Sequence, residues 1–490
     1  MIVMKNFFFS VLFLYCLNSF GQNEDKVWYF GASGAGIDFR DCSPIVKTNG
    51  NNASSALEGA VSICDASTGR LLFYSSEAKI IDSTFNVMPS GLNVGNGTSG
   101  TQSTIVRKPG SSTIFYYIVT DIQGGTIPSF STSAKGLSYA IIDMSLNGGL
   151  GDVVSSHNPI KDTSNCEKLT TIKHANGTDV WLIAHEYNNN KFLVYLIDNT
   201  GINLTPAIYN VGPSITALQS TTYASSRFDA IGELKASPDG NKIAFTTLYN
   251  GITCLFDFDK STGIISNPLS LNLNGFGGYG VSFSSDNQKL YISCVDTTDF
   301  NSPVNSEIVQ FDLSSSIPAI IQGSKVVINF CSTCSYRSLK LAPNGKIYCA
   351  KIPTIPESEY LAVINNPNNS GISCNYVHNG IYLNGKYGSW GLNNIMESNN
   401  YCLETQGIQD QALFSLVELS FDNLTSSLNF NCKIKNAELR LFDLGGKIIK
   451  QTNLDLGVSK LDIKAIQNGI YIATIFIDNA PTTNLKFLKN

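Results

Sequence analysis

Charged residues are scarce in this 490-residue sequence: Asp, Glu, Lys and Arg together make up 14%, against about a quarter in an average soluble protein. Lys plus Arg (33) do not exceed Asp plus Glu (38), and only four histidines are present. Without a basic excess we expect no nucleic-acid partner. The composition also excludes a coiled coil and a disordered chain.

Long apolar runs are missing after the first twenty residues, so no transmembrane segment is expected. Residues 7–17 form an apolar run that is too short to cross a bilayer, which takes roughly 20 residues. Lys5 precedes this run, and Ser19 and Gly21 stand at positions −3 and −1 of a cleavage site before Gln22. This pattern is typical of a secretory signal, and we predict a signal peptide over residues 1–21.

Catalytic motifs are also missing. The sequence contains no G-x-S-x-G elbow, no H-E-x-x-H and no P-loop. His185 and Glu186 end an apolar strand pattern, where a general base is conceivable but a hydrogen-bonded strand end is commoner. Asp257 and Asp259 could ligate Ca²⁺, although a solvated surface is the commoner explanation. We therefore expect no enzyme activity, no cofactor and no metal.

The cysteines of an exported chain meet an oxidising compartment, where an odd number leaves at least one free thiol or an intermolecular bond. Signal cleavage removes Cys16 from the 12 cysteines and leaves an odd number in an oxidising compartment. Cys331 and Cys334 have C-x-x-C spacing, but no partner His or second pair is evident, so a local disulfide or two loop cysteines remain the alternatives. Three other cysteines stand in apolar strand patterns and are expected in the core: Cys254, Cys294 and Cys349.

Abundant Gly (41), Tyr (21) and Phe (27) indicate a β-rich chain with many turns. Three segments of this chain repeat one pattern: a strand, a turn of the Pro-Asp-Gly type and an apolar strand. They cover residues 234–245, 281–292 and 339–350, and weaker copies lie upstream. The predicted turns are at Gly69, Gly110, Gly177, Gly240, Asn287 and Gly345. Third strands that end near Asp or Asn are predicted at residues 136–143, 192–198, 253–259, 308–312 and 360–365.

Repeated units of three or four strands that cannot bury their faces alone are typical of β-propeller blades. We predict an all-β chain with a propeller over residues 22–400, in which seven blades are favoured and six are possible; a pair of β-sandwiches is the alternative. The first strand, residues 26–31, lacks an evident blade and is expected to pair with residues 387–392, closing the ring from both ends.

Several motifs of this region resemble large exported propeller proteins of the Bacteroidetes, in the YVTN/WD40-like group. The similar residues are Trp28-Tyr-Phe-Gly31, Ala35-Gly-Ile-Asp-Phe39, Ser237-Pro-Asp-Gly240, Leu341-Ala-Pro-Asn-Gly-Lys-Ile-Tyr348, Asn366-Pro-Asn368, Gly371 and Cys374. Gly388-Ser-Trp-Gly-Leu392 stands where that group often has Gly-Leu-Pro, and Asn393 replaces the proline. The resemblance implies a fold and a lineage, since propellers serve many functions.

The pattern changes after residue 400. A polar linker is predicted over residues 401–411, and short strands over residues 412–490 suit a small immunoglobulin-like β-sandwich. This segment resembles the type A sorting domain of the type IX secretion system, without the usual Pro-Asn-Pro opening. The residues that carry the resemblance as a sorting signal are Asp443, Gly445, Gly446, Lys447, Gly469, Tyr471, Lys486 and Lys489.

The sorting-domain resemblance implies passage across the outer membrane by the type IX secretion machinery and a secreted or surface-attached product. The expected function is binding or adhesion, with an extracellular glycan or protein as ligand. The candidates for a stacking platform at one mouth of the propeller are Tyr376, Tyr382, Tyr387 and Trp390. Aromatic side chains also often fill the interfaces between blades, which is the alternative for these four residues. The alternatives are a polysaccharide lyase or hydrolase and a structural surface component.

Overall fold

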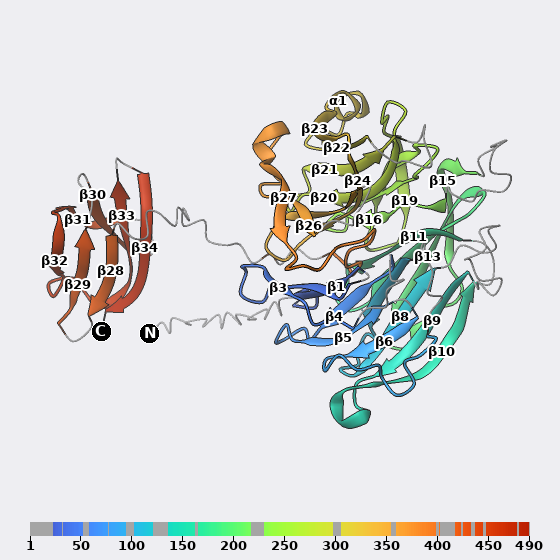
Figure 1. Ribbon diagram of the computed structural model, residues 1–490, viewed down its shortest axis with the longest axis horizontal. Helices are drawn as coiled ribbons and strands as arrows, with labels where there is room; N and C mark the ends of the chain where they lie inside the picture. Colours follow the sequence, from blue (N-terminus) through green and yellow to red (C-terminus); the bar gives the residue numbers. More distant parts are fainter. Residues whose placement is uncertain are drawn as a thin grey trace, which may run out of the picture. The chain divides into compact units, whose positions relative to one another are not determined.

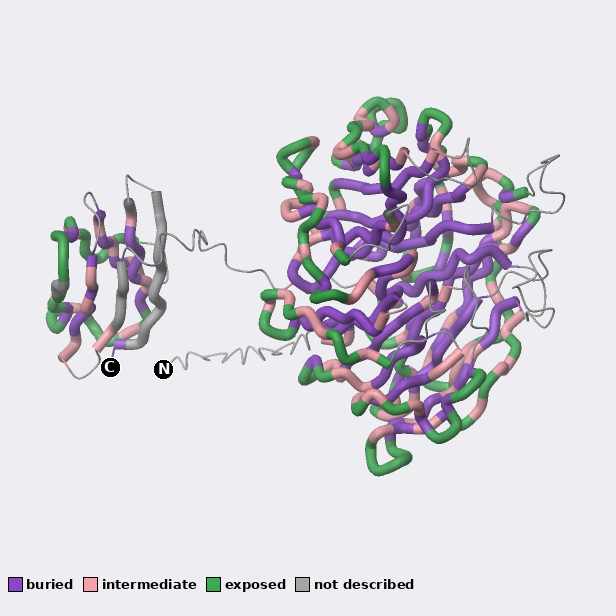
Figure 2. The backbone as a smooth tube through the Cα atoms, viewed as in Figure 1, coloured by how far each residue is buried: buried purple, intermediate pink, exposed green. Residues whose placement is uncertain are grey.

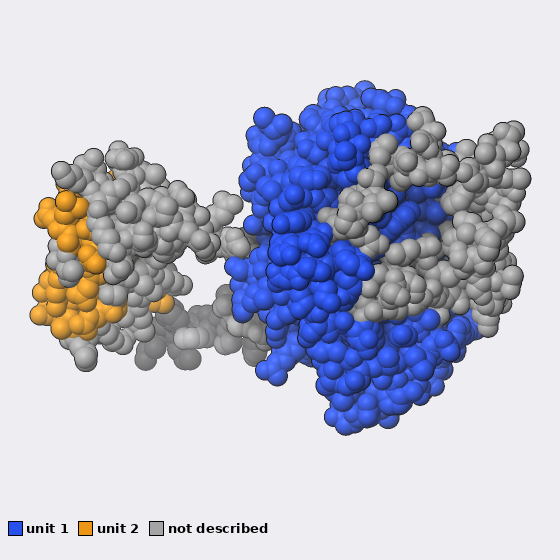
Figure 3. Space-filling view, in the orientation of Figure 1, with its two compact units in different colours: residues 1–402 blue, residues 403–490 orange. Residues whose placement is uncertain are grey.

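A computed structural model describes residues 23–31, 33–51, 58–76, 78–94, 102–120, 136–161, 165–216, 230–296, 305–353, 359–397, 401, 417–422, 425–432, 437–443, 447–477 and 480–489. Of residues 353, 417–420, 458–459, 477 and 480–488 only the backbone is described. The chain divides into two compact units, residues 1–402 and residues 403–490, which are coloured separately in Figure 3. The predicted signal peptide lies outside the described residues, as does the predicted linker except for Tyr401.

Seven antiparallel sheets, called blades below, follow one another along the first unit. The first blade contains β1 (Val27–Phe30), β2 (Ala35–Asp38) and β3 (Ile45–Lys47). The second contains β4 (Val61–Cys64), β5 (Leu71–Ser76) and β6 (Lys79–Asp82). The third contains β7 (Gln102–Arg107), β8 (Ile114–Thr120), β9 (Leu137–Asp143) and β10 (Asp152–Lys161). The fourth contains β11 (Asn165–Lys173), β12 (Val180–Glu186), β13 (Asn189–Asp198), β14 (Gly201–Ile202) and β15 (Ala207–Ile215).

The last three blades have four strands each. The fifth blade contains β16 (Leu234–Ala236), β17 (Lys242–Thr246), β18 (Thr253–Phe258) and β19 (Ile265–Ser270). The sixth contains β20 (Gly277–Phe283), β21 (Lys289–Val295), β22 (Ser306–Asp312) and β23 (Val326–Cys331). The seventh contains β24 (Cys334–Leu341), β25 (Ile347–Pro353), β26 (Tyr360–Ile364) and β27 (Tyr376–Tyr382). The described short helices are η1 (Asn147–Gly149), α1 (Pro318–Gly323) and η3 (Gly371–Cys374).

The blades are arranged in a closed ring, which confirms the predicted propeller and its seven blades. The first strand of each blade contacts the first strand of the next, from β1 through β4, β7, β11, β16 and β20 to β24. The seventh blade returns to the first, where Trp28 packs edge-on against Tyr348. Figure 1 shows the colours passing around the ring until β26 and β27 lie beside β1.

All six predicted turns join the first and second strands of blades two to seven. Each turn residue has a positive φ, from 64° at Asn287 to 77° at Gly177. Gly240 is also needed for space, because a Cβ there would lie 2.9 Å from the Ile172 side chain. The turn residues of the repeat therefore predicted the positions of blades two to seven correctly.

The third strands of several blades end at an aspartate, as the repeat indicated. Asp143, Asp198 and Asp259 each accept a hydrogen bond from the backbone N–H two residues later. Hydrogen bonds from the following Ser or Thr hold the pKa of these three carboxyls below their ordinary value. These aspartates close turns between the third and fourth strands, so Asp259 has a structural role. Asp257 instead forms an ion pair with Lys242.

The prediction that the first strand pairs with residues 387–392 is wrong. β1 pairs with β2 across the turn at Gly31–Gly34, and β2 pairs with β3, so the N-terminal residues form a blade of their own. Residues 383–397, which include the predicted partner, form no strand. The ring is closed by packing between two complete sheets, with side chains of β1 and β25 in one core.

The second unit contains two antiparallel sheets and a shared apolar core, as predicted for a small sandwich. One sheet contains β28 (Val417–Asp422), β29 (Ser427–Cys432) and β32 (Gly457–Asp462), and the other contains β31 (Ile448–Leu454), β30 (Ala437–Asp443), β33 (Gly469–Ile477) and β34 (Ala480–Lys489). Leu439 and Leu441 share the buried face of β30, as its alternation predicts. Within the described residues, no helix of either unit has the length and apolar character needed to span a membrane.

Candidate binding site at one mouth of the ring

A segment that follows the last blade occupies the inside of the ring. This axial segment, residues 388–397, contacts all seven blades, and its middle residues, from Leu392 to Ile395, are buried. Figure 2 shows the buried backbone concentrated in the inner strands of the propeller. At Gly391 a Cβ would lie only 3.1 Å from the Cα of Glu58, so the segment passes close to the backbone that leads into β4.

Asn393 ties the axial segment to the first two blades. Its Oδ1 accepts a hydrogen bond of 2.6 Å from the backbone N–H of Ser62 in β4. Its Nδ2 donates to Oδ1 of Asp25, just before β1. The asparagine that replaces the proline of the resembling group thus has a specific role, because proline has no side-chain amide.

Asn394 ties the same segment to the next three blades. Its Nδ2 lies 3.1 Å from the carbonyl oxygen of Ser103 in β7 and 3.2 Å from that of Leu169 in β11. Its Oδ1 accepts a hydrogen bond of 2.6 Å from Nζ of Lys235 in β16. One buried amide side chain therefore satisfies two carbonyls and an ammonium from three different blades.

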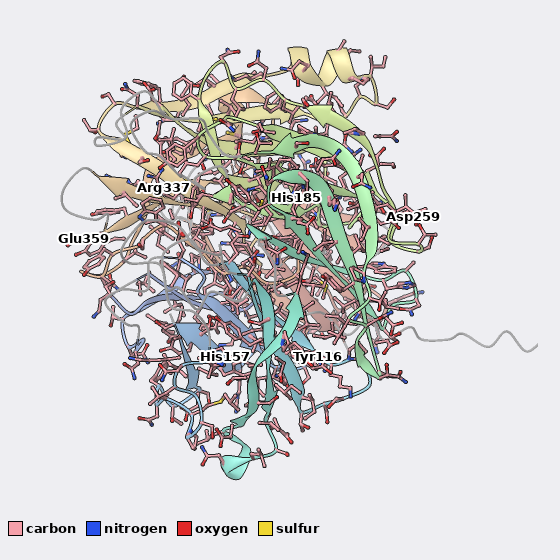
Figure 4. All side chains as sticks on the ribbon, turned by 90° about the vertical axis from the view of Figure 1, so that its right-hand side faces the viewer. Tyr116, His157, His185, Asp259, Arg337 and Glu359 are labelled. Atoms are coloured by element: carbon pink, nitrogen blue, oxygen red, sulfur yellow. A yellow bond between two sulfur atoms is a disulfide. The ribbon has the colours of Figure 1, made fainter. Side chains whose placement is uncertain are left out.

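Trp390 completes the set of contacts at blades six and seven. Its carbonyl oxygen accepts a hydrogen bond of 3.0 Å from the backbone N–H of Ser338 in β24. Its ring packs edge-on against Tyr279 of β20, and the Arg337 guanidinium stacks 4.2 Å from the ring centre. Figure 4 labels Arg337 among the strands of the propeller.

A buried ion cluster lies where the axial segment ends. Nζ of Lys340 in β24 lies 3.2 Å from Asp25 and 2.9 Å from Glu397. Burial raises the pKa of Asp25 to about 6, although Lys340 opposes this shift. Burial lowers the pKa of Lys340, but the two carboxylates outweigh it and leave the pKa raised.

A cavity of about 980 Å³ lies at the mouth formed by the turns at Gly110, Gly177 and Gly240. We call this end of the ring the hairpin mouth. Residues of the first five blades line the cavity, and Ile395, Met396 and Glu397 of the axial segment contribute to its lining. The volume is in the range of small-molecule sites.

The lining of the hairpin mouth mixes apolar and polar residues, and its charged side chains are four cationic and four acidic ones. Its positively charged side chains are Arg107, Lys108, Lys173 and Lys260, and its hydroxyl-bearing residues are Ser111, Ser112, Thr171, Thr178 and Ser237. Its acidic residues are Glu24, Asp25, Asp239 and Glu397. Among the described residues that line this mouth, none is aromatic.

Two groups in the mouth have pKa values shifted toward each other. Burial raises the pKa of Glu24, which lies 3.5 Å from Nε of Arg107. Burial lowers the pKa of Lys173, whose charge is favoured by Glu24 and disfavoured by Arg107. Incompletely solvated charges of this kind interact strongly with a charged ligand.

The four aromatic residues proposed as a platform lie in different parts of the propeller. Tyr376 and Tyr382 belong to β27, the outer strand of the seventh blade, whereas Trp390 lies inside the ring. Tyr387 lies beside the first blade, where its backbone exchanges hydrogen bonds with the Ser33 hydroxyl. No ring contact joins any two of them among the described residues, so the structure does not assemble a platform from this set.

His185 lies inside the fold. Its side chain is fully buried against Phe192 and Phe245, and its Nδ1 donates to the Glu186 carbonyl oxygen at 2.6 Å. Burial lowers its pKa to about 3, so the imidazole stays neutral at any physiological pH. This placement matches the structural alternative for the residue. Figure 4 labels His185 between strands and Asp259 at the edge of the same view.

The described sorting residues lie at one end of one sheet in the second unit, where Asp443 is paired with Tyr471 and Gly469 with Lys489. Asp443 ends β30, and its Oδ1 accepts a hydrogen bond of 2.9 Å from the backbone N–H of Lys447. Gly469 and Tyr471 lie on β33, and Lys489 at the end of β34 bonds to Asn468 beside them. Gly445, Gly446 and the side chain of Lys486 lie outside the described residues.

Sequence reasoning missed the axial segment and its buried partners. A signal was available, because two copies of the repeat carry a lysine within an otherwise apolar inner strand, at Lys235 and Lys340. A buried lysine requires a partner. The partners could not be identified, since they lie beyond the last repeat and before the first.

The C-terminal segment has a clear family match. Residues 422–490 match the secretion system C-terminal sorting domain, which confirms the predicted type IX sorting domain. Such a domain marks a protein for export to the cell surface or medium. Among curated protein sequences, none matches this chain.

Solved structures show only distant similarity. A Bacteroides fragilis NCTC 9343 protein, provisionally assigned as a 6-phosphogluconolactonase, is 11% identical with a TM-score of 0.39, covering 89% of this chain and 98% of its own. The periplasmic gluconolactonase of Pseudomonas aeruginosa is 10% identical with a TM-score of 0.38, covering 79% and 95%. PorZ, a surface component of the type IX secretion system of Porphyromonas gingivalis, is 10% identical with a TM-score of 0.31, covering 95% and 74%. These similarities are too low to transfer an activity or ligand.

Proposed function

We propose that this protein, which ends in a sorting domain of the type IX secretion system, is an extracellular binding protein whose hairpin mouth recognises an acidic glycan. The observation that supports this proposal most directly is a cavity of about 980 Å³ with four cationic side chains in its lining, beside four acidic ones. A carboxylate-bearing sugar offers one group for the cations and several hydroxyls for the serines and threonines around them.

The rigidity of the mouth favours binding. The axial segment contacts every blade by hydrogen bonds or ring packing, and the ion cluster of Lys340, Asp25 and Glu397 lies at the end nearest the cavity. A site built on closed sheets and a fixed floor loses little conformational entropy when a ligand binds. The absence of aromatic residues from the described lining disfavours neutral sugars, which are commonly held by ring stacking.

The test is calorimetric titration of the full-length secreted protein with acidic and neutral oligosaccharides of equal length. We expect binding of the acidic series alone. Arg107→Gln and Lys173→Gln should each weaken it about tenfold, the effect of losing one charge-assisted hydrogen bond. Lys191→Gln is the matched control, because Lys191 pairs with Glu186 outside the cavity. Equal affinity for both series would reject the proposal.

An enzyme acting on the same acidic glycan is a second candidate, because Glu24 and Lys173 have oppositely shifted pKa values in one cavity. Such a pair suits general acid and base chemistry. Assaying the titration mixtures for shorter sugars distinguishes the two functions. Product that disappears in Glu24→Gln while binding persists would favour the enzyme, and binding without product would favour the binding protein.

A further inference from the structure

Two cysteines and a histidine meet where the sixth blade joins the seventh. Cys331 is the last residue of β23, Cys334 is the first of β24, and His378 lies on β27. One metal-binding atom of each residue lies within 4.8 Å of the other two. Both cysteines are buried and the histidine is partly buried. This cluster is independent of the hairpin mouth, since none of its members lines that cavity.

Cys331 and Cys334 form a disulfide in the structure. One of the two alternatives left open by the sequence is therefore correct, but His378, 44 residues beyond Cys334, was not evident as a third member. Reduction by an external dithiol or phosphine adds two electrons and two protons and gives two thiols. A divalent cation that displaces both thiol protons would then be held by two thiolates and one imidazole.

We propose that, in the reduced chain, Cys331, Cys334 and His378 bind one thiophilic divalent cation of the Zn²⁺ type. The C-x-x-C spacing and the mixed sulfur and nitrogen donors are those of protein zinc sites. A tetrahedral ion with bonds of about 2.0 to 2.3 Å holds its ligand atoms about 3.3 to 3.8 Å apart. The observed separations, up to 4.8 Å, require only small side-chain movements to reach this geometry.

Hydrogen bonds around His378 favour a ligand role. Its Nδ1 lies 3.2 Å from the Tyr336 hydroxyl and 3.0 Å from the Tyr376 hydroxyl, and Tyr376 also donates to Tyr336 at 2.8 Å. Asn329 donates to the Tyr336 hydroxyl at 2.6 Å. These contacts orient the His378 ring, as the hydrogen-bond partners of metal-binding histidines do.

Three protein ligands leave one position of a tetrahedral ion for water or another ligand. The proposed site is therefore of the open kind. Oxidation by an external disulfide, which takes two electrons from the two thiolates and is itself reduced to two thiols, re-forms the Cys331–Cys334 disulfide, removes two of the three ligands and would release the ion. The cluster would then hold a cation under reducing conditions and release it when the disulfide forms.

The probe is Co²⁺, whose thiolate complexes absorb strongly through sulfur-to-cobalt charge transfer. Full-length protein is reduced with a phosphine without oxygen, freed of reductant, titrated with Co²⁺ and then with Zn²⁺. We expect one Co²⁺ per reduced chain, loss of the absorption when Zn²⁺ replaces it, and no absorption from the oxidised chain. Absence of the band from the reduced chain, with unchanged circular dichroism, would overturn the proposal.

Variants separate this site from other thiols. The double variant Cys331→Ser/Cys334→Ser should lose the band, and His378→Gln should weaken Co²⁺ binding at least tenfold. Cys374→Ser is the matched control, because Cys374 is another buried cysteine of the seventh blade and lies outside the cluster. A band that persists in the double variant, or disappears in Cys374→Ser alone, would assign the metal elsewhere. If the double variant does not fold, the absence of the band from the oxidised chain and the weaker Co²⁺ binding of His378→Gln still test the proposal.

Discussion

Nζ of Lys235 donates a hydrogen bond of 2.6 Å to Oδ1 of Asn394, although 159 residues separate them in the sequence. Both side chains are buried at the inside of the ring. The contact links the fifth blade to a segment that follows the seventh, so it joins parts of the propeller that are far apart in the sequence. The axial segment therefore holds together blades that are far apart in the sequence.

Asn394→Ala should destabilise the propeller by about 2–4 kcal/mol. The substitution leaves the carbonyls of Ser103 and Leu169 without this donor and removes an acceptor from Lys235, and each buried polar group left unsatisfied costs about 1–3 kcal/mol. Urea unfolding of the full-length protein measures the loss. Asn210→Ala, at an exposed position on β15, is the control and should change stability by less than about 0.5 kcal/mol. Equal effects of the two would show that the axial amide is dispensable.

Lys340→Met should cost about 3–5 kcal/mol at neutral pH, because it leaves Asp25 and Glu397 as buried carboxylates without their cation. Acid should restore part of this loss, since protonation removes the uncompensated charge. Urea titrations at pH 7.5 and pH 5 test both statements. Lys242→Met removes the partly exposed pair with Asp257 and should cost no more than about 1 kcal/mol. A loss in Lys340→Met that does not depend on pH would contradict the assignment to charge.

Asp25 should give the propeller a component of stability that decreases as pH rises from about 4 to about 6. Its folded pKa of about 6 lies above the ordinary value of 3.8, so the folded chain binds the proton more tightly than the unfolded chain. Stability from this group is then greatest below the unfolded pKa and is lost as pH rises through the folded pKa.

Other carboxyls with depressed pKa values, such as Asp65 at about 2, act in the opposite direction. The difference in unfolding free energy between wild type and Asp25→Asn, followed across this pH range, isolates the component of Asp25. A difference that stays constant with pH would show that Asp25 keeps an ordinary pKa.

The blades were predictable because their signals are local. A turn at Gly240 or Asn287 requires a left-handed φ and is flanked by apolar strands, and both facts are contained within about twelve residues. The first blade was mispredicted because its hairpin lacks the Pro-Asp-Gly type of turn and turns instead between Gly31 and Gly34. The pairing partner of the first strand is decided by the fold as a whole, and the local sequence pattern does not indicate it.

The candidate sites were not predictable because their members lie on different strands and blades that only the folded propeller brings together. Asp25 and Lys340 belong to opposite ends of the propeller sequence, and Arg107 and Lys173 to successive blades. His378 reaches the cysteine pair only because β27 lies at the outer edge of the blade that Cys334 begins. No spacing rule in the sequence relates residues that only the folded sheets bring together.

Leu439→Ala in β30 should destabilise the second unit by about 2–5 kcal/mol, the cost of removing a fully buried leucine side chain. Because this unit is the sorting domain, export should fail along with its folding, and the protein should accumulate inside the outer membrane. Immunoblots of medium, surface and periplasmic fractions measure the distribution. Ile449→Ala is the control, since that side chain on β31 is 38% exposed and should leave export unchanged. Normal export of Leu439→Ala, with a demonstrably unfolded second unit, would mean that the machinery recognises a linear segment and that the packing of the sandwich serves another purpose.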